Sequence, residues 1–424
     1  MDFNLEPELV AYLKTLDDFI AAEIKPLQAQ DDNERFFDHR REWARTDFEN
    51  GGLPRHEWEA LLREAKNRSD KAGHLRFGLP KEYGGQDGNN LWMAVIRDHF
   101  ASQGLGLHND LQNEHSIVMN APIVLMLRDF GTATQREMIP QIIEGRARVT
   151  FGLTEPDHGS DATHMETRAV RETRDGKPGW RIDGEKMWTT GMHVATHCLL
   201  FARTSGKDGD ARGITAFIVD ANDPGVKIEE YLWTFNMPTD HPRVSFTNIW
   251  VADDTILGDE GGGLAVAQHF VHENRIRQAA SSLGAAHYCV TESVRYARER
   301  KPFGQELARN QGIQFPLVEL ATQVEMLRLL IRKTAWEMDK MPKPQVAIEL
   351  SDKVSMCNYW ANRLVCEAAD RAMQVHGGIG YSRHKPFEHI YRHHRRYRIT
   401  EGSEEIQMRK IAGHLFGYMG PGKH

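Results

Sequence analysis

Residues 198–219 read CLLFARTSGKDGDARGITAFIV and depart most clearly from the helical pattern in the rest of the chain. Both ends of this stretch are short apolar runs rich in β-branched and aromatic residues, which favour strands, and turn formers lie between them. Similar runs occur at 149–151 and 244–251, and the Asp183-Gly184 pair is typical of a tight hairpin. The sequence therefore predicts a compact antiparallel β domain in this region.

Helical periodicity flanks the β region on both sides. An opening helix that ends near Pro26 is predicted by apolar residues spaced three and four apart, namely Leu9, Leu13, Leu16, Ile20 and Ile24. Further helices are predicted at 58–66, 92–103 and 116–127. After Gly263, one apolar helix face is formed by Ile313, Leu317, Leu320, Val324, Leu327 and Ile331.

The predicted fold class is therefore α+β. We expect an N-terminal helical domain at 1–148, a middle β-barrel or sandwich domain at 149–260, and a C-terminal domain at 261–424 that is similar to a four-helix bundle. The sequence shows no strand-helix-strand alternation and no GxGxxG after a strand, so a Rossmann nucleotide site is not expected.

The composition disfavours several classes of protein. The 424 residues carry 53 basic and 60 acidic side chains, so no global field attracts a nucleic-acid backbone. Cys198, Cys289, Cys357 and Cys366 lack CxxC spacing, which disfavours a disulfide framework or a zinc site. The N-terminus lacks a signal-peptide pattern, and no apolar run has the length of a membrane span. We expect a bacterial cytoplasmic protein, or an organelle-matrix protein without its targeting peptide, that binds neither nucleic acid nor membrane.

Several motifs carry a resemblance to a known family. They are LTEPDHGSD at 153–161, GEKMWTT at 184–190, RKPFG at 300–304 with Gln311 after it, QVHGGIG at 374–380, and EGS at 401–403 before Ile406-Gln407. With these motifs the chain resembles the acyl-CoA dehydrogenase family from about Pro80 onward. The resemblance implies the acyl-CoA dehydrogenase fold, an FAD cofactor, and α,β-dehydrogenation of an acyl-CoA to the trans-2-enoyl-CoA.

The resemblance also implies a flavin site on the β domain. The residues expected to flank the flavin ring are Phe151, Leu153, Thr154, Trp188 and Thr190. Ser160 is expected where the flavin pyrophosphate meets the substrate. Taken alone, residues 154–156 would be an ordinary loop leaving a strand. A flavin ring needs a flat aromatic neighbour and hydrogen-bond donors, however, and Trp188 with its threonines provides both.

A second group of residues is expected to complete the FAD site of a neighbouring subunit. By resemblance, this group consists of Arg300, Phe303, Gln311, Gln374 and Gly378. An arginine offers the donor fork that a pyrophosphate accepts, and glycines allow close approach of the backbone. The alternative is a surface arginine beside a core aromatic at a helix end. The resemblance implies at least a homodimer, and a tetramer is common in the family.

Desaturation of a thioester requires a base that removes the α proton while a hydride leaves the β carbon. Glu401 matches the catalytic carboxylate of the family, and Ser403 is a good N-cap for the helix that follows. A helix N-terminus favours the carboxylate, so an effective base also needs an apolar, dry surrounding. The alternative is a solvated acid near a helix cap.

Other positions around this base follow from the same resemblance. Some family members carry their base one residue before the arginine matched by Arg275, and here that residue is Asn274, an amide. Arg275 is expected beside the carboxylate as a catalytic or positioning residue. Substrate contacts are expected from Ser160, Arg275, Thr400 and Gly402, and further cofactor contacts from Ser403 and Glu405. Glu405 replaces a polar amide of many relatives, so its contact with the adenosine is expected to differ.

Two segments have open interpretations. The basic run at 391–398 is predicted to be a helix with solvated cations and some pairing to acids, rather than a phosphate-binding patch. The acyl pocket is expected along 111–127, where Asn113, His115 and Asn120 would make it polar.

The predicted partners are an acyl-CoA and an electron-transferring flavoprotein. The alternatives are a flavin oxidase or monooxygenase of the same fold, or a helical scaffold without catalysis. Glu401 argues against the hydroxylases, which have no need of that base. His193 and His197 are four apart but have no evident third ligand, so we expect no metal site.

Overall fold

The computed structural model describes residues 4–109, 117–235 and 238–421. The chain forms two compact units. The helical unit contains Met1–Arg45, Arg55–Asn120 and His272–His424, and the β unit contains Thr46–Pro54 and Ala121–Val271. The N-terminal and C-terminal helices therefore belong to one unit. The finer division into three domains at 148 and 260 stays a prediction.

The β unit is built on a seven-stranded sheet with the strand order β3-β6-β4-β5-β9-β8, in which β7 also pairs with β6. The strands are β3 (Val149–Gly152), β4 (Arg168–Arg174), β5 (Lys177–Lys186), β6 (His197–Arg203), β7 (Ile214–Asp220), β8 (Val226–Tyr231) and β9 (Pro242–Ala252). Most neighbours are antiparallel, as predicted, and β3 and β4 run parallel to β6. The apolar stretch at 198–219 forms the β6–β7 hairpin, with Cys198 opposite Val219.

The tight hairpin predicted at Asp183-Gly184 is wrong. The turn lies at Asp175-Gly176 between β4 and β5, where φ is 53° and 74°. Asp183 and Gly184 lie inside β5, where the register with β9 shifts. A Cβ atom on Gly184 would lie 2.4 Å from Oγ1 of Thr167. The glycine is therefore needed for close packing at an irregular point of the strand rather than for a turn.

Short helices accompany the sheet in the β unit. They are α5 (Pro122–Phe130), α6 (Ala133–Arg136), α7 (Met138–Ile143) and α8 (Gly263–Gln268). The helix predicted at 116–127 begins only at Pro122, because proline is favoured in the first turn, where no N–H bond is required. The predicted acyl-pocket residues Asn113 and His115 lie outside the described residues.

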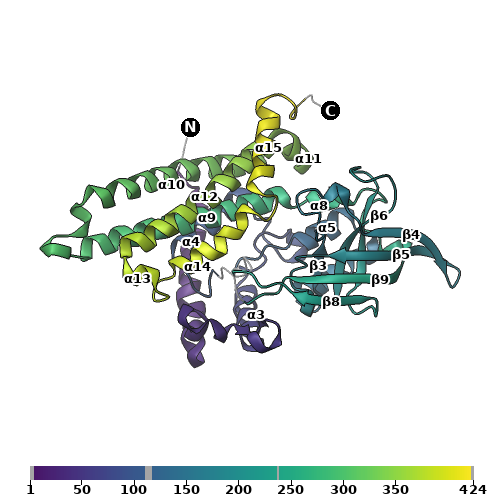
Figure 1. Ribbon diagram of the computed structural model, residues 1–424, viewed down its shortest axis with the longest axis horizontal. Helices are drawn as coiled ribbons and strands as arrows, with labels where there is room; N and C mark the ends of the chain where they lie inside the picture. The colour runs from purple at the N-terminus through teal and green to yellow at the C-terminus, as the bar shows by residue number, and fades with distance from the viewer. Residues whose placement is uncertain (1–3, 110–116, 236–237, 422–424) are drawn as a thin grey trace. The chain divides into compact units, whose positions relative to one another are not determined.

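The helical unit contains both long and short α-helices. They are α1 (Pro7–Phe19), α2 (Lys25–Ala29), α3 (His56–Lys71), α4 (Asn90–Ser102), α9 (Val271–Glu299), α10 (Gln311–Met338), α11 (Lys343–Glu349), α12 (Ser351–His376), α13 (Gly378–Tyr381), α14 (Phe387–Arg395) and α15 (Glu404–Leu415). Helix α12 packs against α10, α14 and α15 (Figure 1). The apolar stripe predicted on α10 is confirmed, since its members from Leu317 to Ile331 are buried.

The opening helix was predicted to end near Pro26, and it continues through Pro26 to Ala29. A π-helical turn at Ile20–Ile24 follows α1, and α2 continues the helix from Lys25 with Pro26 in its first turn. A π turn has more residues per turn than an α-helix and therefore rotates the side chains that follow it. Ile20 and Ile24, within this turn, are both buried.

A buried ion pair joins two strand ends in the β unit. Nζ of Lys186, at the end of β5, lies 2.7 Å from Oε1 of Glu155, and both side chains are almost completely buried. The Glu155 carboxylate also accepts hydrogen bonds from the backbone N–H groups of Glu166 and Thr167. Burial alone would raise the pKa of Glu155, but Lys186 and these donors hold it below its usual value. The pair therefore fixes the loop after β3 to the end of β5.

Lys186→Met should lower the free energy of unfolding by about 3 kcal/mol or more, because it leaves a buried carboxylate without its counter-charge. Equilibrium denaturation in urea measures the loss. Lys177→Met is the matched control, since Lys177 is exposed at the start of the same strand. Equal unfolding free energies for the two variants would contradict a structural role for the pair.

Candidate functional site

The β unit presents the predicted flavin-ring residues at the ends of β3 and β5. The backbone N–H of Met187 donates to the carbonyl of Thr154 at 2.8 Å, which holds the two motifs side by side. Trp188 is 47% exposed, and its φ of 63° lies in the left-handed region. A strained backbone that carries an exposed indole is costly, so it points to a bound partner for the ring.

The other predicted residues of this group lie nearby in the β unit. The ring of Phe151 packs 4.9 Å from that of Phe201 and is half-buried. Thr190 is exposed, and its hydroxyl lies 2.8 Å from Nδ1 of His241. Leu153 is half-buried, and Ser160 is exposed in the loop after β3. The β unit therefore offers one exposed aromatic face with hydroxyl groups beside it.

Glu401 lies in the helical unit, in the loop between α14 and α15. Its φ is 57°, and the φ of Gly402 is 88°, so two successive residues adopt the left-handed conformation. Such a conformation costs a non-glycine residue about 1–2 kcal/mol, and packing must hold it in place. The Glu401 residue is half-buried.

Arg275, on α9, holds the backbone of Glu401 in this conformation. Its Nε and Nη2 atoms donate to the carbonyl oxygen of Glu401 at 2.9 and 2.6 Å. Burial lowers the pKa of Arg275, whereas the charge of Glu401 acts in the opposite direction. A Cβ atom on Gly402 would lie 2.7 Å from Nη2 of Arg275, so the guanidinium requires glycine at that position. Arg275 is therefore a positioning residue for the Glu401 backbone.

The residues that follow Glu401 begin α15. The Ser403 hydroxyl accepts a hydrogen bond from the Ile406 N–H at 3.4 Å, which confirms the predicted N-cap. Gly402 and Ser403 are half-buried, whereas Thr400 and Glu405 are exposed.

Asn274 cannot act as a base. Its side-chain oxygen accepts a hydrogen bond from Nδ2 of Asn120 at 2.6 Å, and an amide does not take up a proton at neutral pH. The neighbouring Glu273 forms an ion pair with Lys343, whose Nζ lies 3.0 Å from its carboxylate. Asn120 also accepts a hydrogen bond from Arg277. Of the three polar residues predicted for the acyl pocket, Asn120 is the one that the structure describes.

Two of the residues predicted to reach a neighbouring subunit, Arg300 and Gly378, line a hollow of the helical unit. This hollow measures about 370 Å³ and is lined by Arg300, Gly377 and Gly378 together with Tyr296, Pro302, Leu307, Val375, His376 and Ile379. Phe303 is completely exposed and has a φ of 54°. Gln311 begins α10 and Gln374 is near the end of α12, and both are exposed. Arg300 and Gly378 are thus brought together, and Phe303 extends into solvent.

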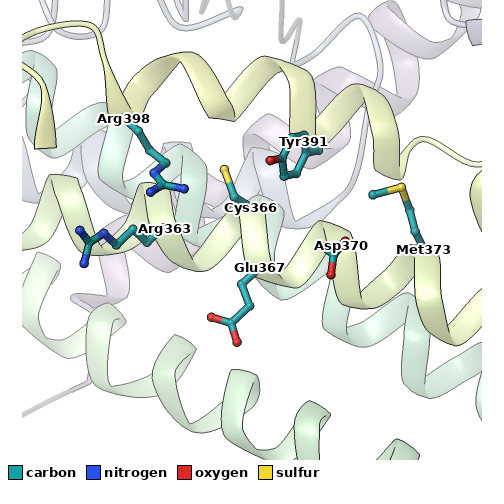
Figure 2. A pocket seen from close by; sticks show the side chains of 7 residues that line it. All are labelled: Arg363, Cys366, Glu367, Asp370, Met373, Tyr391 and Arg398. Atoms are coloured by element: carbon teal, nitrogen blue, oxygen red, sulfur yellow. The ribbon is translucent and has the colours of Figure 1, made fainter.

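A larger hollow of about 600 Å³ lies on α12 and was not predicted (Figure 2). Figure 2 shows Arg363 and Arg398 at one end, with Glu367 and Asp370 farther along α12. Both arginines bind the Glu404 carboxylate, with N–O distances between 2.9 and 3.2 Å. These hydrogen bonds lower the pKa of Glu404 to about 2. The arginines therefore fix the start of α15.

The pairing to acids that was predicted for the run at 391–398 is confirmed, and its four arginines are half-buried rather than fully solvated. His393, His394 and Tyr397 are buried. Arg392 binds Glu42 and Glu388 at 2.9 and 2.6 Å, and Arg398 binds Glu404. The partner Glu42 is far away in the sequence, so the local pattern could not reveal it.

The described residues contain neither a metal-ligating cluster nor a membrane-spanning helix. Within 4–109, 117–235 and 238–421, no group of three or more His, Cys, Asp or Glu side chains could hold a metal ion. His193 lies in a short 3-10 turn and His197 begins β6, so they do not share a helix face. Across the same residues, no helix combines the length and apolar character needed to cross a membrane. The four cysteines are buried free thiols.

Comparison with known proteins agrees with this arrangement. Residues 150–249 match the family model of the acyl-CoA dehydrogenase middle domain, and residues 261–416 match that of the C-terminal domain. The 3-(aryl)acrylate reductase of Clostridium sporogenes is 32% identical over 83% of this chain and 90% of its own length. Subunit CarC of the caffeyl-CoA reductase-Etf complex of Acetobacterium woodii is 30% identical over 83% and 89% of the two chains.

A solved structure of the same fold also matches this chain. Butyryl-CoA dehydrogenase from Megasphaera elsdenii superposes with a TM-score of 0.78 at 26% identity, covering 98% of this chain and 100% of that one. The predicted α+β fold is thereby confirmed. The family models and the relatives together show that the chain belongs to the acyl-CoA dehydrogenase family, oxidoreductases that act on acyl-CoA.

Proposed function

We propose that the protein is an FAD-dependent acyl-CoA dehydrogenase in which Glu401 removes the α proton of the thioester. The observation that carries this proposal is the left-handed Glu401-Gly402 pair, whose backbone is held by the buried Arg275. A capping-region acid would need neither this strain nor a buried guanidinium on its carbonyl. A base must be held within hydrogen-bond reach of its proton, so a fixed backbone is what the reaction requires.

FAD is the cofactor of this family, and the described residues fit it. Trp188 supplies an exposed flat face for the ring system, and Phe151, Leu153, Thr154 and Thr190 lie around the same strand ends. Ser160, Ser403 and Glu405 are the further contacts that we propose. Bound FAD would accept the hydride that leaves the β carbon. The chain itself binds the thioester, excludes water around it, and takes up the α proton at the Glu401 carboxylate.

A second copy of the chain would complete this cofactor site. Phe303 is completely exposed, and Arg300 lines a hollow with two glycines. An arginine fork is suited to a pyrophosphate, and glycines allow the backbone to approach it closely. We therefore propose a homo-oligomer in which Arg300, Phe303, Gln311, Gln374 and Gly378 of one subunit contact the FAD of another.

The direction of the reaction depends on the electron partner. The two relatives described above are named as reductases, and one belongs to an Etf complex, so reduction of a 2-enoyl-CoA is a second candidate. In that direction Glu401 would deliver a proton to the α carbon, because both directions pass through the same transition state. We propose dehydrogenation, with an electron-transferring flavoprotein as the acceptor.

Glu401→Gln should retain bound FAD and acyl-CoA affinity but lose flavin reduction. The amide has nearly the same shape but cannot accept the proton, so the anaerobic reduction rate should fall about 10²- to 10⁴-fold. Stopped-flow bleaching of the yellow flavin by a panel of acyl-CoAs measures this rate. Glu57→Gln, an exposed glutamate on α3, is the matched control. A wild-type bleaching rate in the Glu401 variant would remove Glu401 from the mechanism.

Arg300→Ala should weaken FAD binding by about tenfold or more, because a charge-assisted hydrogen bond contributes roughly 1.5–3 kcal/mol. Titration of apoprotein with FAD, followed by flavin fluorescence, measures the dissociation constant. Lys301→Ala is the control, since Lys301 is an exposed cation next in sequence. If both variants bind FAD as the wild type does, the proposed contact across subunits is wrong.

A further inference from the structure

A closed ring of hydrogen bonds surrounds the backbone of the proposed base. Arg275 donates to the carbonyl of Glu401, and Nε2 of Gln407 donates to the carbonyl of Gly402 at 2.9 Å. The same Nε2 donates to Oδ1 of Asn358 at 2.9 Å. The ring closes because Nδ2 of Asn358 donates to the backbone carbonyl of Arg275 at 2.9 Å. The side chains of Arg275 and Gln407 thus fix the two carbonyls of the left-handed pair, and Asn358 bonds to the Arg275 backbone and to the Gln407 side chain.

Asn358 is the centre of this ring. It is completely buried on α12, and its amide nitrogen also donates to Oε1 of Gln278 at 3.3 Å. Its oxygen accepts a second hydrogen bond, from Nδ2 of Asn362 at 3.1 Å. An amide can make about four hydrogen bonds, so Asn358 is fully satisfied. Asn362 in turn donates to the carbonyl of Tyr397, at the start of the segment that leads to Glu401.

Packing alone does not account for these amides. The buried positions around Asn358 on α12 include apolar residues, among them Val354, Cys357 and Ala361, as well as the polar Ser355 and Asn362. Oε1 of Gln407 is buried without a hydrogen-bond partner among the described residues. Such an orphan acceptor costs about 1–3 kcal/mol, which an apolar side chain of the same shape would avoid. Gln407 nevertheless places its donor on the Gly402 carbonyl.

We propose that Asn358 and Gln407 are positioning residues for proton abstraction, which they serve by holding the Glu401-Gly402 pair in its left-handed conformation. This inference rests on the proposed role of Glu401 as the base. Arg275 alone fixes one carbonyl and leaves the next peptide free to rotate. The ring fixes both carbonyls and also ties Arg275 to α12, so the carboxylate keeps one position relative to the thioester. A displacement of the carboxylate by about 1 Å would slow proton transfer by up to roughly 100-fold.

Two variants of nearly unchanged shape test the proposal in the FAD-loaded enzyme. Asn358→Leu and Gln407→Met remove the hydrogen bonds, and Ser355→Ala is the control because Ser355 is buried on the same helix and its hydroxyl donates to the carbonyl of Ser351. The first two variants should lose about 10- to 100-fold in kcat with unchanged KM and FAD content. They should also show a larger kinetic isotope effect with α-deuterated acyl-CoA, because proton removal becomes the slow step. The control should match the wild type in all four quantities.

The double variant Asn358→Leu/Gln407→Met should lose little more than either single variant, because one broken link already opens the ring. If the losses multiply instead, the two residues act independently and the ring is not the functional unit. If Asn358→Leu folds with bound FAD and keeps the wild-type kcat and isotope effect, the inference is wrong even when Glu401→Gln is inactive. Failure of the proposed function itself would appear separately, as full activity of Glu401→Gln.

Discussion

The hydrogen bonds from Arg275 to the carbonyl of Glu401 are the interaction on which the functional account depends. They place a charged side chain on a peptide whose φ of 57° is unfavourable for glutamate. The guanidinium is itself buried and therefore needs a compact bundle around it. The long helices α9 and α12 provide this bundle, and the Glu404 carboxylate fixes the start of α15 through two further arginines. Strain at one residue is thus supported by the packing of the helical unit.

In the β unit, a buried ion pair holds the proposed flavin-binding segments in place. Its two sequence motifs are separated by more than twenty residues, yet the Lys186–Glu155 pair and the hydrogen bond from Met187 to Thr154 hold them together. A buried ion pair is seldom the most stabilising choice, but it is strongly directional. Exposed Trp188 extends from this rigid base. Each unit therefore holds its proposed cofactor or substrate groups in loops that are anchored to strands or helices, and precise catalysis favours such anchoring.

The helical periods and the apolar strands could be predicted from the sequence because burial imposes a repeating pattern. The stripe on α10 and the β6–β7 hairpin are examples. The Asp183-Gly184 hairpin was misplaced because a glycine can serve a turn or a close contact, and only the neighbouring Thr167 distinguishes the two.

Long-range partners limited the prediction of the site. The basic run at 391–398 pairs with Glu42 from the N-terminal segment, which no local pattern indicates. Glu401 and Arg275 were predicted by resemblance, but the left-handed backbone and the ring through Asn358 were missed. Two amides, Asn358 and Asn362, four residues apart on an apolar helix face are the signal that could have identified the ring.

Deuterium exchange at the α carbon tests the central claim most directly. An acyl-CoA whose β carbon bears no hydrogen cannot be oxidised, because no hydride can leave. In D₂O, deuterium that enters its α carbon therefore measures proton removal alone, and mass spectrometry detects it. The account predicts that the FAD-loaded wild type incorporates deuterium at the α carbon and that FAD-loaded Glu401→Gln does not. Equal incorporation by the two proteins would contradict the assignment of Glu401 as the base.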